Sequence, residues 1–483
     1  MSAIKFSVSA TSSKNPTATV VGVVPSGKGV ATLPEVGLTP KTLESLGVKS
    51  KIDSISRTVG SNGEILVLAG LGTASPTIHQ LREIGGAIGR LCSDLTFIDV
   101  LLPTADAAEL LALLEGIALG AYEYPRDGKD KLALKSVHAV SAHKLSKAEL
   151  LGVTVLAEAT HTVRNLSVTP ANLLYPEIFA KKAVAEADAH GLKVQVWDEK
   201  ALFKDGFGAI LGVGQGSIRP PRLVKLVYAP KGARKHLAIV GKGITFDTGG
   251  LAVKPLPGML GMKYDMTGAA VAFQSVLAVA KLGLPIKVTA WLCLAENMVS
   301  GSAVKPGDVI KAKNGKTIEV TNPDAEGRLV MADGLSAASL ETPDLIVDVA
   351  TLTGAARVAL GIRYSALMGT DEGVSALQNA AAKSGELVWH MPLPSELRAN
   401  LDSPVADLAN MRVGATAGGA LVAALFLKEF IGVNAKGESL EWAHLDIAGP
   451  ADNEGAAYGF TPKGPTGVML RTMVALAGQM SAR

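Results

Sequence analysis

Short apolar runs alternate with stretches of helical period along almost the whole chain, and this alternation constrains the fold most. It is typical of α/β proteins, in which helices cover a largely parallel sheet. In the first third we expect strands at 17–24, 64–70 and 94–102, and helices at 78–91 and 105–122. Beyond it we expect strands at 223–228, 237–240, 286–292 and 345–350, and helices at 177–190, 266–282, 373–384 and 416–430.

The chain has 483 residues, which at roughly 100–200 residues per domain suggests more than one folded unit. A helical period over 147–166 ends at Thr169-Pro-Ala-Asn, and we place the domain boundary near this helix. The fold class that we predict is therefore α/β with two domains. A smaller α/β domain covers 1–160, and a larger doubly wound α/β domain with a central mixed sheet covers 161–483.

The charge balance excludes a broad positive field of the kind that favours nucleic acid or anionic membranes. Lys and Arg number 47, Asp and Glu number 44, and the net charge is +3. The two cysteines, Cys92 and Cys293, lie in apolar surroundings, which predicts buried thiols in a reducing compartment. We expect no signal peptide, and no segment reaches the roughly 18 apolar residues of a membrane span.

Two glycine patterns and one histidine have structural explanations. The segment Gly22 to Gly29 resembles a phosphate loop, but Gly29 stands where a Ser or Thr should hold magnesium, so nucleotide binding is kept only as an alternative. Gly70-Leu-Gly72 is expected to be a turn. The eight histidines lack zinc-site spacing, and we expect His444 to be a buried, hydrogen-bonded residue near a strand end.

Charged residues interrupt glycine-rich and alanine-rich sequence between 240 and 334. Lys242 and Asp247 follow the strand predicted at 237–240, where a parallel sheet places its ligands. Lys254 comes seven residues after Asp247. Asp265 precedes a helix, where an N-cap role is the alternative explanation.

Asp324, Glu326 and Arg328 occupy alternate positions, and in an extended segment their side chains would project to one side. Carboxylates held so close repel one another unless a positive charge lies between them. Four carboxylates and a lysine amine can hold two divalent ions, which is hydrolase chemistry. An ordinary salt-bridge network is the alternative.

Several segments carry a family resemblance. Lys242-Gly-Ile-Thr-Phe-Asp-Thr-Gly-Gly, Met262-Lys-Tyr-Asp-Met and Asn322-Pro-Asp-Ala-Glu-Gly-Arg-Leu resemble the signatures of the cytosolic leucine aminopeptidase family, the two-metal exopeptidases. The resemblance covers nearly all of residues 165–475 and is weak over 1–160. It implies a hydrolase that removes an N-terminal residue, preferably an apolar one such as leucine, from peptides. It also implies a cytoplasmic homohexamer in which 1–160 serves oligomer contacts or regulation and 161–483 is the catalytic metallopeptidase domain.

The resemblance also assigns the site. One ion, zinc or manganese, would be held by Lys242, Asp247, Asp265 and Glu326, and a second by Asp247, Asp324 and Glu326. Charged Lys254 would stabilise the oxyanion, and Arg328 would hold a bicarbonate that accepts a proton. The substrate pocket would include Met262, Thr351, Leu352 and Gly354, with the Leu352 carbonyl receiving the substrate amine.

One residue departs from the family pattern. Pro323 stands where the family usually has threonine, which removes a backbone N–H but permits an extended conformation. Some members of this family have a DNA-binding or scaffold role, and that role remains an alternative function.

Overall fold

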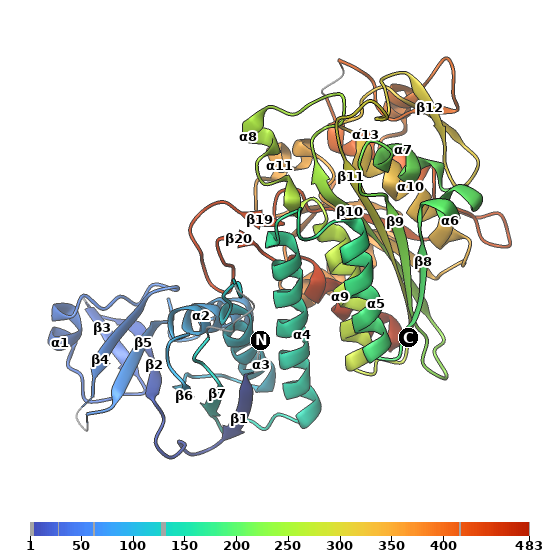
Figure 1. Cartoon of the computed structure of the whole chain (residues 1–483). Helices are drawn as coiled ribbons and strands as arrows, with labels where there is room; N and C mark the ends of the chain where they lie inside the picture. Colours follow the sequence, from blue (N-terminus) through green and yellow to red (C-terminus); the bar gives the residue numbers. More distant parts are fainter. Residues whose placement is uncertain (1–3, 28, 61–62, 127–131, 415–416, 483) are drawn as a thin grey trace. The chain divides into compact units, whose positions relative to one another are not determined.

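The computed structural model describes the chain except residues 1–3, 28, 61–62, 127–131, 415–416 and 483 (Figure 1). The chain forms two compact units. The first comprises residues 1–161 and 453–464, and the second comprises 162–452 and 465–483. The long helix α4 (Lys147–Val168) contains the boundary between them.

The first unit is built on a seven-stranded sheet with the order β1-β7-β6-β2-β5-β4, in which β3 pairs with β2. Glycines allow two of its helices to pack closely, because a Cβ at Gly120 would lie 2.1 Å from the carbonyl oxygen of Gly86. The strands are β1 (Lys5–Ser9), β2 (Ala18–Ser26), β3 (Gly29–Leu33), β4 (Ile55–Val59), β5 (Ile65–Gly70), β6 (Phe97–Leu101) and β7 (Ser136–Val140), and the helices are α1 (Pro40–Ser45), α2 (Ile78–Leu91) and α3 (Ala107–Gly120).

The second unit is built on an eight-stranded mixed sheet with the order β16-β15-β18-β14-β10-β11-β9-β8. Its four central strands, β18, β14, β10 and β11, are parallel and almost wholly buried, as their apolar sequences predict. The strands are β8 (Lys193–Trp197), β9 (Arg222–Tyr228), β10 (His236–Asp247), β11 (Lys287–Asn297), β14 (Leu345–Ala350), β15 (Ser365–Gly369), β16 (Val388–His390) and β18 (Trp442–Asp446).

Helices cover both faces of this sheet. Helices α7 (Gly208–Gly214), α10 (Glu326–Ser339) and α13 (Gly419–Lys428) share one apolar core with residues such as Val240 and Ile346. Helix α9 (Thr267–Lys281) packs on the opposite face, where a Cβ at Gly241 would meet the Ala269 backbone. The remaining helices are α5 (Pro176–Ala189), α6 (Glu199–Lys204), α8 (Leu256–Met259), α11 (Gly354–Leu360), α12 (Asp371–Ser384) and α14 (Leu470–Ser481).

Smaller elements complete the fold: the 3-10 helices η1 (Met262–Tyr264) and η2 (Ser395–Leu401), a three-stranded sheet of β12 (Asp308–Lys311), β13 (Thr317–Val320) and β17 (Leu408–Ala409), and the pair β19 (Asp452–Asn453) and β20 (Gly464–Pro465). In the part of the chain that the structure describes, we find no helix with the length and hydropathy needed to cross a membrane.

The predicted fold class is confirmed, with local corrections. Lys242 and Asp247 lie within β10 rather than beyond it, because the strand continues to Asp247. Gly22 to Ser26 belong to β2 and pair antiparallel with β3, which begins at Gly29, so a strand and not a phosphate-binding helix follows this segment. Lys28 itself lies outside the described residues. Both cysteines are free and buried, as predicted. His444 is buried within β18, with Nδ1 2.5 Å from Asp348 Oδ1, which also confirms its prediction.

Candidate active site

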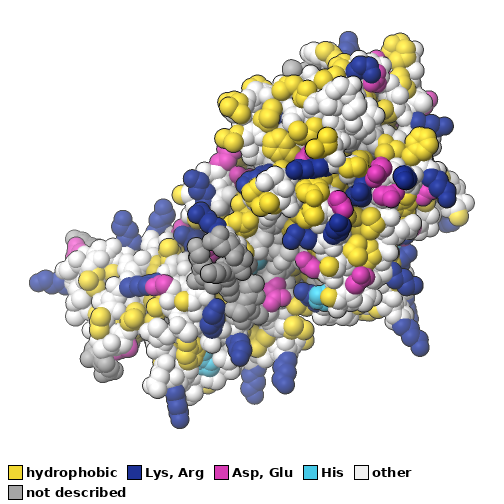
Figure 2. All heavy atoms as spheres, in the orientation of Figure 1, with side chains coloured by type: hydrophobic (Ala, Val, Ile, Leu, Met, Phe, Trp, Pro, Cys, Tyr) yellow, Lys and Arg dark blue, Asp and Glu magenta, His cyan; other side chains and the backbone are white. Residues whose placement is uncertain are grey.

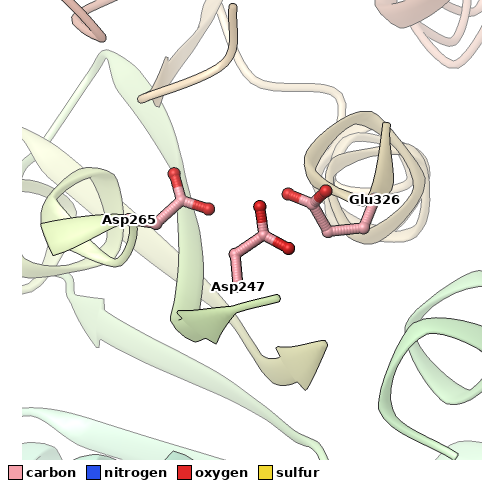
Figure 3. A group of neighbouring side chains, drawn as sticks. All are labelled: Asp247, Asp265 and Glu326. Atoms are coloured by element: carbon pink, nitrogen blue, oxygen red, sulfur yellow. The ribbon is translucent and has the colours of Figure 1, made fainter. Parts of the chain in front are cut away.

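Three buried carboxylates converge where the central parallel strands end (Figure 3). Asp247 is the last residue of β10, Asp265 lies just before α9, and Glu326 is the first residue of α10. One oxygen from each lies within 4.8 Å of the others. Asp265 does not cap α9, whose N-cap is Met266 without a side-chain bond, so the capping explanation is wrong. Its carboxylate faces the other charged groups instead.

Lys242 occupies the centre of this cluster. Its Nζ donates to Asp265 Oδ1 at 2.8 Å and to the Thr351 carbonyl oxygen at 3.0 Å, and it lies 3.0 Å from Glu326 Oε1. Burial disfavours the ammonium, but the surrounding carboxylates outweigh burial and raise the pKa of Lys242. The ammonium therefore supplies positive charge that Asp265 and Glu326 require.

Lys254 neutralises a second part of the cluster. Its Nζ lies 2.9 Å from Asp247 Oδ2 and forms an ion pair with Asp324. Burial opposes its charge, yet Asp247 and the other carboxylates raise the pKa of Lys254 above its usual value. The two lysines thus stay charged and divide the four predicted carboxylate ligands between them.

Burial and the neighbouring negative charges raise the pKa values of two of these carboxylates. Burial, together with the charge of Asp247, raises the pKa of Glu326 to about 8 and that of Asp265 to about 6. Asp265 Oδ2 is buried and, although it lies 2.8 Å from Lys242 Nζ, accepts no hydrogen bond from a described residue. A compact set of buried carboxylate oxygens with spare acceptor capacity and one amine fits a divalent cation.

The structure adds Asn297, for which no role was predicted from the sequence. It ends β11, the strand beside β10, and its Nδ2 donates to Asp247 Oδ1 at 2.8 Å and to the Pro323 carbonyl oxygen at 3.1 Å. One amide thus holds a carboxylate and the loop that carries Asp324. Its position after a long apolar run was the signal that could have identified it.

Arg328 lies in a helix and not in the extended segment that its alternation with Asp324 and Glu326 predicts. The segment from Glu326 onward is helix α10, so Asp324, Glu326 and Arg328 do not share one side of a strand, and that prediction was wrong. The buried guanidinium donates from Nη1 to the Asn410 carbonyl oxygen at 2.7 Å. Its Nε is buried and finds no hydrogen-bond partner among the described residues. Burial lowers the pKa of Arg328 to about 10.

The predicted pocket residues lie on two segments next to the carboxylates. Thr351 follows β14 and donates from Oγ1 to Asp265 Oδ1 at 2.6 Å. Leu352 is partly buried beside it, and Gly354 begins α11 with an exposed backbone. Half-buried Met262 begins η1, three residues before Asp265.

Comparison with known proteins identifies the family of this chain. The catalytic domain of the cytosol aminopeptidase family matches residues 161–474. The chain belongs to the cytosol aminopeptidase family. Within the family, it is 48% identical over 454 residues to a probable cytosol aminopeptidase of Clavibacter michiganensis subsp. michiganensis, covering 91% of this chain and 90% of the relative. A probable cytosol aminopeptidase of Leifsonia xyli subsp. xyli is 50% identical over 450 residues, with the same coverage.

A solved structure supports the membership. The chain resembles the bottromycin maturation enzyme BotP in complex with Mn with a TM-score of 0.85 and 34% sequence identity. The alignment covers 97% of this chain and 100% of that one. The α/β fold of this cytosol aminopeptidase family member therefore extends over both units.

Proposed function

We propose that this chain is a metal-dependent aminopeptidase that removes the N-terminal residue of peptides and prefers apolar residues such as leucine. The observation that carries the proposal is the buried cluster of Asp247, Asp265 and Glu326 around Lys242, in a chain that belongs to the cytosol aminopeptidase family. The manganese complex of a relative with the same fold supports the metal.

Two divalent ions, zinc or manganese, are proposed at this cluster. Lys242, Asp247, Asp265 and Glu326 would hold one, and Asp247, Asp324 and Glu326 the other. When bound, such a pair supplies a water of lowered pKa and positive charge at the scissile carbonyl. Lys242 must lose its proton to act as a ligand, and nearby cations favour that loss.

The chain's own residues orient and polarise the substrate. Lys254, held charged by Asp247 and Asp324, would donate a hydrogen bond to the oxyanion that forms at the scissile carbonyl. The Leu352 carbonyl would receive the substrate amine, and Met262, Thr351 and Gly354 would border its side chain. This arrangement favours a free, unblocked N-terminus.

Arg328 is proposed to hold a bicarbonate that accepts a proton from the attacking water. The buried Nε, which has no hydrogen-bond partner among the described residues, supports this role, because an N–H donor left without a partner fits an anion. A homohexamer, with 1–160 serving oligomer contacts or regulation, and a cytoplasmic location are also proposed; the names of the cytosol aminopeptidase relatives support the location.

The test compares leucine amide with N-acetyl-leucine amide on the protein loaded with Mn²⁺ or Zn²⁺. The proposal predicts release of leucine from the first, no cleavage of the second, and loss of activity on chelation. Comparable rates on both substrates, or activity that survives removal of the metal, would show a different class of hydrolase.

A further inference from the structure

One peptide plane beside the cluster is held from both of its ends. The carbonyl oxygen of Thr351 accepts a hydrogen bond from Lys242 Nζ at 3.0 Å. The N–H of Leu352, which belongs to the same peptide group, donates to Asp446 Oδ1 at 3.1 Å. The bond between them is trans, so its C=O and N–H point in opposite directions. Fixing the N–H therefore fixes where the carbonyl points.

Asp446 is suited to hold this plane. It ends β18, pairs in register with Ala350 on β14, and is 1% exposed. The next residue after Ala350 is Thr351, so the carboxylate lies beside the loop as it leaves the sheet. A buried carboxylate is costly unless its oxygens are hydrogen-bonded, and Asp446 Oδ1 also accepts from the Ala448 N–H at 3.1 Å.

The second carboxylate oxygen of Asp446 holds the next residue of the loop, Thr353. Oδ2 accepts from Thr353 Oγ1 at 2.6 Å, and the same hydroxyl accepts from the Ala356 N–H at 3.0 Å at the start of α11. Asp446 thus fixes two consecutive residues, Leu352 and Thr353. Thr351, the residue before them, contacts both Lys242 and Asp265.

We propose that Asp446 is a positioning residue that locks the Thr351–Leu352 peptide with its carbonyl oxygen toward Lys242. It would thereby orient the lysine amine and the adjacent Leu352 carbonyl. This inference rests on the proposed function for its effect on metal and substrate, but the locking of the peptide itself does not. Asp446 contacts neither the lysine nor a carboxylate of the cluster through a described hydrogen bond, so it acts through the loop.

The variants separate the hydrogen bond from the charge. In Asp446→Asn the amide oxygen still accepts from Leu352, and Thr353 Oγ1 can accept from the amide nitrogen. Asp446→Ala removes both acceptors, and Asp446→Ser, whose shorter side chain cannot reach Leu352, replaces it if the alanine variant does not fold. Asp333→Asn is the matched control, because Asp333 is also buried and accepts three backbone N–H bonds, from Ala209, Ile210 and Lys313.

Amide hydrogen exchange, measured on the full chain without metal, tests directly whether Asp446 holds the Leu352 N–H. The Leu352 amide should exchange at least about tenfold faster in Asp446→Ala than in the wild type, and within about threefold of it in Asp446→Asn. The control Asp333→Asn should lower the melting temperature without changing exchange at Leu352. Unchanged exchange at Leu352 in Asp446→Ala would overturn the proposal.

Titration with Mn²⁺ alone and kinetics with leucine amide measure the consequence. Asp446→Ala should weaken Mn²⁺ binding about 10- to 100-fold, the range found when a partner of a metal ligand is removed, and raise KM. Asp446→Asn should restore most of both. Faster exchange with unchanged Mn²⁺ affinity and KM would overturn the link to the site. A wild type that neither binds Mn²⁺ nor cleaves leucine amide would refute the proposed function, while the exchange result would still decide the role of Asp446.

Discussion

The ammonium of Lys242 lies 2.8 Å from the carboxylate of Asp265, although 23 positions separate the two residues in the chain. Two glycines make this approach possible. A Cβ at Gly268 in α9 would lie 2.0 Å from the Val349 carbonyl oxygen, and a Cβ at Gly327 in α10 would lie 2.7 Å from Lys242 Nζ. The site thus depends on both helices packing against the ends of β10 and β14 without side chains at these points.

Gly327→Ala should disrupt the site more than the fold. Alanine is the better helix former by about 1 kcal/mol, but its methyl group occupies the place of the Lys242 side chain. We expect Mn²⁺ affinity to fall at least about tenfold, measured by calorimetric titration. Gly478→Ala in α14, where a Cβ meets no atom within 4 Å, is the control and should bind Mn²⁺ normally. Wild-type affinity in Gly327→Ala would show that Lys242 is not a ligand.

Asn297→Ala should weaken metal binding indirectly, because Asn297 is hydrogen-bonded to the proposed ligand Asp247. The substitution removes the donor that holds the Asp247 carboxylate and the Pro323 carbonyl, so the Asp247 side chain and the loop at Pro323 gain freedom. A loss of about 10- to 100-fold in Mn²⁺ affinity is expected. Asn314→Ala, in the exposed turn between β12 and β13, should have no effect. Equal affinities in both variants would remove Asn297 from the site.

Alanine substitutions of Lys254 and Lys242 should have different effects on turnover and on metal binding. Lys254→Ala removes the cation that we propose to stabilise the oxyanion, so kcat should fall by about 10²–10³ while metal stays bound. Lys242→Ala should weaken one metal site, and added metal should restore part of the activity. Titrating Mn²⁺ into both apo variants while following turnover distinguishes them. Metal loss in Lys254→Ala, or two tightly bound ions in Lys242→Ala, would reverse the assigned roles.

His236 should make the fold sensitive to acid. Burial and the nearby Lys287 lower the pKa of His236 to about 4, and the neutral ring contacts Thr289 Oγ1 at 3.0 Å. In the unfolded chain the His236 ring takes up a proton near pH 6.5, whereas in the folded chain it stays neutral down to about pH 4. The stability that the neutral ring contributes is therefore fully present above pH 6.5 and is lost as the pH falls toward 4. The slope is at most about 1.4 kcal/mol per pH unit.

The test measures the free energy of unfolding between pH 7 and pH 4.5. The difference in the free energy of unfolding between wild type and His236→Gln should shrink as the pH falls. A wild-type advantage as large at pH 4.5 as at pH 7 would contradict this expectation. The charged groups around the ring that such a measurement includes are Lys225, Lys287, Glu341 and Asp344.

The sequence predicted which charged side chains gather in the site better than it predicted their local structure. Lys242 and Asp247 could be found because a polar pair at the end of a buried apolar run marks the carboxyl edge of a parallel sheet. The start of α10 was missed because Asp324, Glu326 and Arg328 alternate like a strand. Pro323, and the Asp324 N–H bonded to Asn322 Oδ1 at 2.9 Å, are the turn signals that precede the helix.

The hydrogen-bond partners of these side chains could not be predicted, since they depend on strand order. Asn297 reaches Asp247 only because β11 lies beside β10, and Asp446 reaches Leu352 only because β18 lies beside β14. The order of strands in a doubly wound sheet does not follow the order of the chain. A local sequence pattern therefore reveals a polar residue at the end of an apolar strand but not its hydrogen-bond partner on the neighbouring strand.

We propose that Glu326 and Asp247 form part of a site for two divalent ions. Equilibrium dialysis of the apo protein against Mn²⁺ tests it most directly, with Glu326→Gln as the isosteric variant and Asp333→Asn as the control on the same helix. We expect two ions per chain in the wild type and the control, and at most one in Glu326→Gln. A wild type that binds one ion or none, or a Glu326→Gln variant that retains two, would contradict it.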